Sequence, residues 1–116
     1  MSANKYFVYF LPEAELELDS IYNYFLLHFR SPKAVNNLAS EVEDAIRVMK
    51  KDPFIYPISI IEGYRVCLVK NYIMFFRVLE EEKEVQIVHV FHGSQDYVSY
   101  FWEQFTWKPL YKFLVI

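Results

Sequence analysis

The stretch of residues 63–96 constrains the fold most, because three runs of strand-forming residues follow one another there with only short polar interruptions. The runs cover residues 64–69, 72–79 and 85–91. β-Branched and aromatic residues bounded by polar turn residues are typical of strands that pair as hairpins. Runs of this length also fit strands better than buried helices. The sequence therefore predicts a three-stranded antiparallel meander.

The residues before the meander predict one short strand and two helices. Residues 5–10 are nearly all apolar or aromatic, and residues 12–29 and 32–51 carry apolar side chains at spacings of three and four. Pro12 and Pro32 suit the first position of a helix, where the missing N–H costs nothing. The predicted stripes are Ala14, Leu18, Ile21, Tyr22, Phe25 and Phe29 in the first helix, and Val35, Leu38, Val42, Ala45 or Ile46, and Met49 in the second. The short link between the helices predicts an antiparallel α-hairpin.

These elements together predict an α+β fold. It consists of an N-terminal strand, an antiparallel α-hairpin packed on a three-stranded antiparallel meander, and a C-terminal helix or extension. The chain of 116 residues is expected to form a single domain, with a core over about residues 5–97 and an extension over about residues 98–116. Residues 110–116 are so apolar that we expect them to be ordered and buried.

Both faces of the predicted meander are apolar. Side chains alternate across a strand, so Val85, Ile87, His89 and Phe91 are expected on one face of the third run. The α-hairpin can cover only one face, and an antiparallel sheet with one wet face alternates more cleanly than this. We therefore expect the second face to be covered by the C-terminal segment, by a second copy of the chain or by another protein.

Composition limits the compartment and the chemistry. No apolar run approaches the ~20 residues that span a bilayer, and the N-terminus lacks a long apolar signal region, so a cytoplasmic protein is expected. The net charge is −3 with scattered cations, which argues against strong nonspecific binding to nucleic acid. The single cysteine, Cys67, is expected to be a small core residue. The acidic residues Glu41, Glu43 and Asp44 fit a solvated helix face, and no metal or cofactor is expected.

Three segments resemble the RelE/ParE superfamily of toxins from bacterial type II toxin–antitoxin systems. They are PEAELELDSIYNY, GYRVCLVKNYIMFFRV and EVQIVHVFHGSQDY, and the resemblance covers about residues 5–97. Its most specific pieces are the Asn71-Tyr72 turn followed by a strand carrying Arg77, and the corner from His92 to Asp96. The order and spacing of these pieces resemble those of the superfamily, and they indicate its fold more strongly than its biological system.

The resemblance implies a growth inhibitor that a small antitoxin neutralises by wrapping around it. RelE-like members cut mRNA on the ribosome, whereas ParE-like members poison DNA gyrase. In this sequence Ile73 stands where the nucleases often carry Arg, and Ser94 and Gln95 stand where the wider family commonly has two arginines. The ParE-like branch is therefore expected, with gyrase as target. An mRNA endonuclease of the RelE type, and a decayed member that binds only its antitoxin, stay open as alternatives, as does a homodimer.

Arg65, Arg77 and His92 are the candidate catalytic residues under the nuclease alternative. The two arginines lie on adjacent predicted strands, where they could bind a phosphate or carboxylate together, or simply pair with carboxylates or cap the sheet. His92, at a strand end, could act as a general acid or base or could stabilise a turn. His89 is expected to be a core histidine with a satisfied hydrogen bond. No Ser-His-Asp, Cys-His or phosphate-loop pattern is present.

Overall fold

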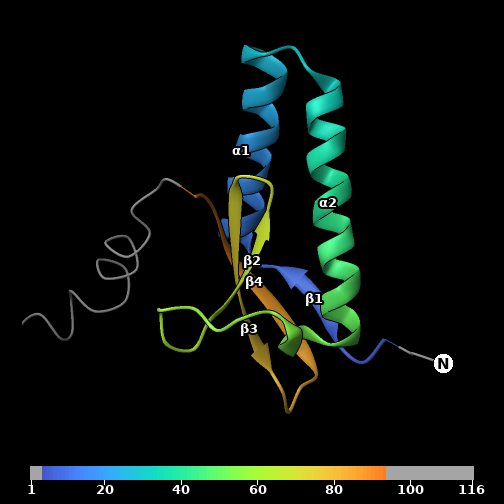
Figure 1. Ribbon diagram of the computed structural model, residues 1–116, viewed down its shortest axis with the longest axis vertical. Helices are drawn as coiled ribbons and strands as arrows, with labels where there is room; N and C mark the ends of the chain where they lie inside the picture. Colours follow the sequence, from blue (N-terminus) through green and yellow to red (C-terminus); the bar gives the residue numbers. More distant parts are fainter. Residues whose placement is uncertain (1–3, 94–116) are drawn as a thin grey trace, which may run out of the picture.

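The computed structural model describes residues 4–93, which form a four-stranded sheet with two helices packed against one face (Figure 1). The elements follow in the order β1 (Phe7–Phe10), α1 (Pro12–His28), α2 (Pro32–Lys51), a short 3-10 turn η1 (Pro53–Ile55), β2 (Arg65–Val69), β3 (Tyr72–Leu79) and β4 (Glu84–His92). The α+β fold predicted from the sequence is confirmed. The predicted C-terminal helix and tail lie outside the described residues.

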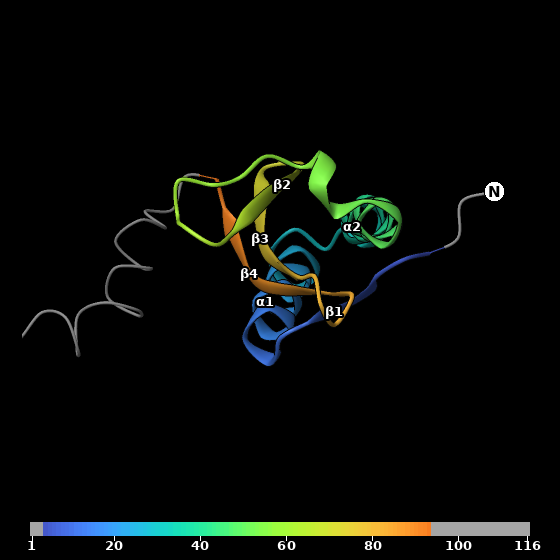
Figure 2. The same ribbon diagram turned by 90° about the horizontal axis from the view of Figure 1, so that it is seen from below.

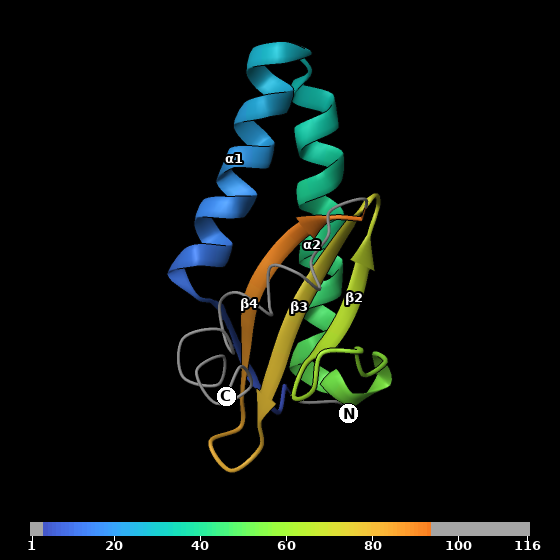
Figure 3. The same ribbon diagram turned by 90° about the vertical axis from the view of Figure 1, so that its left-hand side faces the viewer.

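The sheet is mixed, with the strand order β1-β4-β3-β2 (Figure 3). β2, β3 and β4 form the predicted antiparallel meander, and β1 pairs in parallel with β4. β1 can be parallel to its neighbour because both helices and the rest of the meander intervene before β4. The sheet edges are therefore β1 on one side and β2 on the other.

The two helices lie side by side on one face of the sheet and enclose the main core (Figure 2). Pro12 and Pro32 occupy the first positions of α1 and α2, as the sequence predicted. The buried side chains of this core include Ala14, Leu18, Leu38, Val42, Ala45, Met49, Met74, Phe76, Val85 and Ile87. The prediction that Phe29 belongs to the buried stripe is wrong, because the helix ends at His28 and Phe29 is 59% exposed. None of the described helices is long and apolar enough to cross a membrane.

A β-bulge in β4 changes which of its side chains face the helices. Phe75 pairs with His89 and the next residue, Phe76, pairs with Ile87, so Val88 is the extra residue. The predicted face of Val85, Ile87, His89 and Phe91 is therefore wrong beyond Ile87. A bulge inserts one residue on one strand only, and strict alternation fails there. Val90 takes the place in the core that strict alternation gives to His89.

The second face of the sheet carries its own buried cluster. Phe75, Val88 and Phe91 are each at most 5% exposed. The partly buried side chains packed against them are Leu11, Ile61, Tyr64, Val66 and Ile73. Leu11 follows β1, and Ile61 and Tyr64 come from the link before β2, so part of the cover comes from segments that the sequence prediction did not name.

Candidate functional site

Arg65 begins β2 and anchors the link that precedes it. Its Nη1 donates a hydrogen bond to the carbonyl oxygen of Tyr56 at 2.7 Å, and its guanidinium lies 5.0 Å from the centre of the Phe54 ring. The same side chain lines a pocket of about 470 Å³ whose wall includes Glu62 and Tyr64. The arginine thus fastens the link to the sheet while one side of it borders a surface pocket.

Arg77 lies on β3 and belongs to a polar chain that crosses three strands. Its Nε donates to Oε1 of Gln86 at 2.6 Å, and Nε2 of Gln86 donates to the Tyr9 hydroxyl at 2.6 Å. The Tyr9 hydroxyl in turn donates to Oε1 of Glu84 at 3.0 Å. Arg77 also lines a pocket of about 270 Å³ together with His89 and the first residues of α1. This series of hydrogen bonds connects β3, β4 and β1, so Arg77 has a structural role at the sheet.

The two arginines point to opposite faces of the sheet. Arg65 pairs across the strands with Phe76, whose side chain lies in the core beneath the helices. Arg77 is the next residue along β3, and neighbouring residues of a strand point to opposite faces. Neither arginine forms an ion pair with a carboxylate of residues 4–93. They therefore do not form a pair that could hold one phosphate between them.

His92 lies at the other end of the meander. It pairs with Tyr72, and the two rings meet edge to face with centroids 5.3 Å apart. The Gly93 N–H donates to the Asn71 carbonyl at 2.8 Å and closes this end of the sheet. Arg77 lies five positions from Tyr72 along β3, which places it roughly 16 Å from this end at the usual strand rise. Arg65, Arg77 and His92 thus occupy three separate places.

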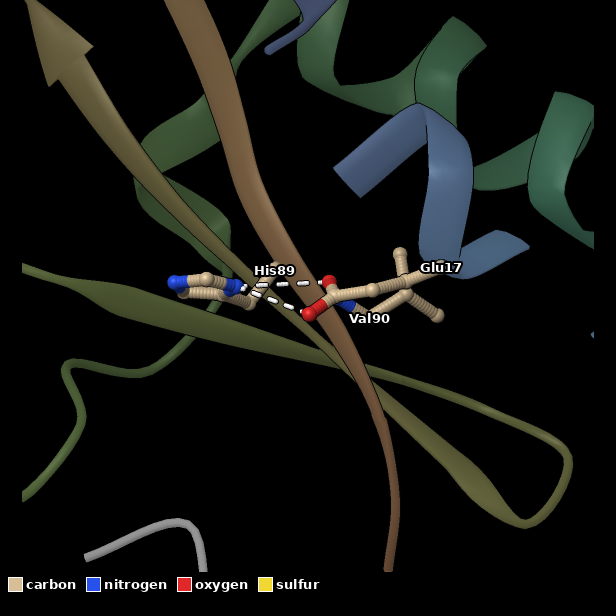
Figure 4. Close-up of polar contacts among 3 residues, drawn as sticks. All are labelled: Glu17, His89 and Val90. Carbon is tan, nitrogen blue, oxygen red and sulfur yellow. Dashed lines mark hydrogen bonds and ion pairs between the residues drawn. The ribbon is translucent and has the colours of Figure 1, made fainter. Parts of the chain in front are cut away.

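Glu17 of α1 holds the edge of β4 at the bulge (Figure 4). β1 follows β4 only as far as Ile87, because the chain then turns through Leu11 into α1. Beyond that point Oε1 of Glu17 accepts the backbone N–H of Val90 at 2.8 Å, in place of a strand. Oε2 of the same carboxylate lies 3.1 Å from Nδ1 of His89, whose side chain is 3% exposed. A carboxylate therefore caps a sheet edge that β1 leaves open.

The predicted role of His89 is confirmed, since it is buried and bonded. Its ring also stacks on Phe91, with centroids 4.9 Å apart and an interplanar angle of 14°. Sequence reasoning missed its partner, Glu17, which looks like one of several acidic residues in the first turns of α1. No sequence signal marks Glu17, because its bond to Val90 exists only where the bulge and the end of β1 coincide.

Cys67 lies in the core beside Tyr56. Burial raises the pKa of the Cys67 thiol, which opposes formation of a nucleophilic thiolate. Burial, with a further contribution from Cys67, raises the pKa of Tyr56 to about 12. The prediction that Cys67 is a core residue is confirmed by its 3% exposure. Across residues 4–93, no three or more His, Cys, Asp or Glu side chains are grouped so that they could hold a metal ion.

Exposed apolar side chains gather along the β2 edge and the link before it. The backbone of the link hydrogen-bonds to β2 only near the start of β2, where the Val66 N–H donates to the Pro57 carbonyl. Four apolar residues of this region are between 62% and 76% exposed: Ile55, Ile58, Ile60 and Leu68. An apolar strand edge is a surface that other polypeptides can pair with. This chemistry suits recognition of a protein better than a reaction at a substrate atom.

The comparisons with known proteins agree with this geometry. The family model for the ParE toxin of the type II toxin–antitoxin system parDE matches residues 8–97. A solved chromosomal ParDE system from P. aeruginosa superposes with a TM-score of 0.63 at 17% identity, over 78% of this chain and 98% of that chain. The RelBE2 toxin–antitoxin complex from Mycobacterium tuberculosis gives a TM-score of 0.56 at 22% identity, over 76% of this chain and 98% of that chain.

No curated protein matches the sequence significantly. The structural matches show the same fold, at identities too low to carry more than the fold. The family model covers most of the chain, from β1 to beyond the end of β4. The chain therefore belongs to the ParE family of toxins of type II toxin–antitoxin systems.

Proposed function

We propose that this toxin acts in the cytoplasm by binding DNA gyrase, without cutting RNA, and that a small cognate antitoxin holds it inactive. The observation that carries the proposal is the separation of its candidate catalytic groups. Arg65 and Arg77 point to opposite faces of the sheet, and His92 lies at its far end. Acid–base catalysis requires groups within hydrogen-bond reach of the same reacting atoms.

The charge distribution also disfavours a polyanionic substrate. Glu80, Glu81 and Glu82 are exposed at the turn between β3 and β4, and Glu84 follows them. The whole chain has a net charge of −3. A nucleic acid approaching this end of the sheet would meet like charge, which lowers both association rate and affinity. A protein target makes no such demand for a basic surface.

Two observations support an antitoxin partner. Both solved relatives come from toxin–antitoxin systems, and the RelBE2 structure is described as a complex. In this chain the centre of the second sheet face is already buried, whereas Ile58 and Leu68 at the β2 edge are 73% and 74% exposed. The β2 edge and its link therefore offer an extended apolar partner more accessible surface than the centre of that face does.

The test is induction of the toxin without its antitoxin, with growth, mRNA integrity and DNA supercoiling followed together. We expect arrest with intact mRNA and gyrase-linked DNA breaks. The purified toxin should inhibit supercoiling by gyrase, and added antitoxin should restore it. Arg65→Ala, Arg77→Ala and His92→Ala variants are made in parallel, with circular dichroism to confirm that each is folded.

The other outcomes assign the other functions. Rapid codon-dependent mRNA cleavage that His92→Ala or Arg65→Ala abolishes would overturn the proposal in favour of a ribosome-dependent nuclease. A folded chain that binds the antitoxin encoded next to it but causes no arrest would be a decayed member of the family. Antitoxin binding that Leu68→Lys leaves unchanged would remove the β2 edge from the proposed docking surface.

A further inference from the structure

The outer side of α1 carries exposed apolar side chains that do not belong to the core. Leu16, Tyr24 and Leu27 are 67%, 49% and 74% exposed. The residues of α1 that face the core are Ala14, Leu18, Ile21, Tyr22 and Phe25. Single exposed apolar residues are ordinary on a protein surface, but several on one side of one helix are not.

The exposed residues fall on one line along the helix. Leu16, Ser20, Asn23 and Leu27 are separated by four, three and four positions, which is the seam spacing of two helices that pack together. All four residues are exposed, and Tyr24 flanks the line next to Asn23. At 100° per residue this line lies opposite the stripe that contains Leu18 and the rest of the core-facing side. α1 thus carries an exposed leucine at each end of a line that lies opposite its core-facing stripe.

We propose that this line is a contact surface for a second copy of the chain, with the two α1 helices packed antiparallel. The line is symmetric about its middle. When the helices run in opposite directions, Leu16 of each copy meets Leu27 of the other, and Ser20 meets Asn23. One two-fold axis therefore satisfies the whole surface, as an isologous dimer requires. This inference depends on neither the proposed target nor the antitoxin.

The charges on α1 favour the antiparallel orientation. Glu13 and Glu15 lie in its first turn, while His28 ends the helix and Arg30 follows directly. In the register that joins Leu16 to Leu27, the acidic first turn of one copy lies beside the end of the other copy's helix, which Arg30 follows outside the helix. A parallel pair would bring acid against acid at one end and base against base at the other. Antiparallel helices also oppose their macrodipoles, which adds to the preference.

The α-hairpin leaves this surface accessible. Its tip projects beyond the end of the sheet, and α1 runs along one outer side of the molecule (Figures 1 and 3). The contact line runs from Leu16 to Leu27 on the 17-residue helix α1 and is roughly 16 Å long. A single helix pair of this length buries less than the ~800 Å² per partner of a standard interface. We therefore expect a concentration-dependent dimer that dissociates on dilution.

Matched substitutions test the surface. Leu27 and Leu68 are each 74% exposed, but Leu68 lies on β2, away from α1. In sedimentation of the purified full chain between about 5 and 200 μM, the wild type and Leu68→Lys should approach the dimer mass. Leu27→Lys should require a concentration at least tenfold higher than the wild type to dimerise. A wild type that stays monomeric throughout, or a dimer that only Leu68→Lys disrupts, overturns the proposal.

Cysteine pairs test the register. Residues 16 and 27 are too far apart on one helix to bridge each other, at roughly 16 Å. The Leu16→Cys, Leu27→Cys double variant should therefore form a covalent dimer under mild oxidation, whereas either single variant should not. Cys67 is 3% exposed and gives little background. Cross-linking of the single variants instead would show a parallel or nonspecific contact, and would refute the antiparallel pairing.

Discussion

The two helices of the hairpin use their surfaces differently. α2 buries Leu38, Val42, Ala45 and Met49 along one stripe, and none of its large apolar side chains is exposed. α1 buries only Ala14 and Leu18 completely and exposes Leu16, Tyr24, Leu26 and Leu27. A helix that is polar on its outer side needs nothing beyond the domain to cover it. α1 exposes leucines on its outer side whose burial would stabilise it further, so of the two helices it is the one suited to a partner.

The two helices also differ in what fixes their first residues. Ser31 caps α2, since its hydroxyl accepts the Ala34 N–H at 3.1 Å. α1 follows Leu11, which has no capping side chain, and its start is fixed from outside because the Leu11 N–H donates to the Ile87 carbonyl of β4. Local sequence thus specifies α2, whereas contacts with the sheet position α1.

Met49→Ala on α2 should destabilise the fold far more than Leu16→Ala on α1. Met49 is fully buried, and removing its side chain leaves a cavity that costs about 3 kcal/mol. Leu16 is 67% exposed, so its truncation should change the free energy of unfolding of the monomer by less than about 0.5 kcal/mol. Urea titrations at low protein concentration compare the two. Equal losses would show that the outer side of α1 is packed against the domain.

Glu17→Ala should be the most costly change of a polar residue on α1. It removes the carboxylate that accepts the Val90 N–H and contacts Nδ1 of His89, at a cost of about 2 kcal/mol. Glu15→Ala, two residues earlier in the same helix and exposed, is the control and should be nearly neutral. Amide exchange at Val90 should also accelerate in the Glu17 variant alone. If both variants lose the same stability, the effect comes from the acidic charge near the start of α1 and not from the bond between Glu17 and Val90.

Much of this fold could be predicted because its signals are local. Proline and serine mark the helix starts, the two-residue turn at Lys70-Asn71 sets the β2–β3 register, and the polar residues 80–83 separate β3 from β4. The register even determines the faces of the two arginines. A turn centred between residues 70 and 71 pairs Arg65 with Phe76, so Arg65 and Arg77 must point to opposite faces. That inference was available from the sequence.

The rest depended on contacts between distant parts of the chain. The parallel pairing of β1 with β4 and the bond from Glu17 to Val90 join segments more than 70 residues apart, and the extra residue Val88 breaks the alternation between the neighbouring strands β3 and β4. The periodicity of apolar residues along the sequence does not indicate such contacts, because each forms where two separate elements meet. The inward stripe of α1 is different, because Ala14, Leu18, Ile21, Tyr22 and Phe25 recur at helical spacing and all five pack toward the core as predicted.

Ser31→Ala should cost about 1 kcal/mol, because the Ala34 N–H loses its cap. Ser40→Ala lies in the exposed middle of the same helix and is the control, which should be neutral or slightly stabilising given the higher helix propensity of alanine. Thermal unfolding followed by circular dichroism measures both. A neutral Ser31→Ala would mean that α2, like α1, is started by the sheet.

The smallest effect is expected for the ion pair that joins α2 to the β2–β3 turn. Nζ of Lys70 lies 2.8 Å from Oε2 of Glu41, and both side chains are nearly half exposed. Water screens such a pair and both long side chains lose freedom in forming it, so Glu41→Gln should cost no more than about 0.5 kcal/mol. The loss should disappear at about 1 M salt, where the Debye length is shorter than the side chains.

A double-mutant cycle with Lys70→Gln separates the pair from the effect of either residue alone. A coupling free energy above about 1 kcal/mol that persists in salt would show that the outer face of α2 contributes to the fold through more than its buried stripe, and the contrast between the helices would then be narrower than their burial indicates.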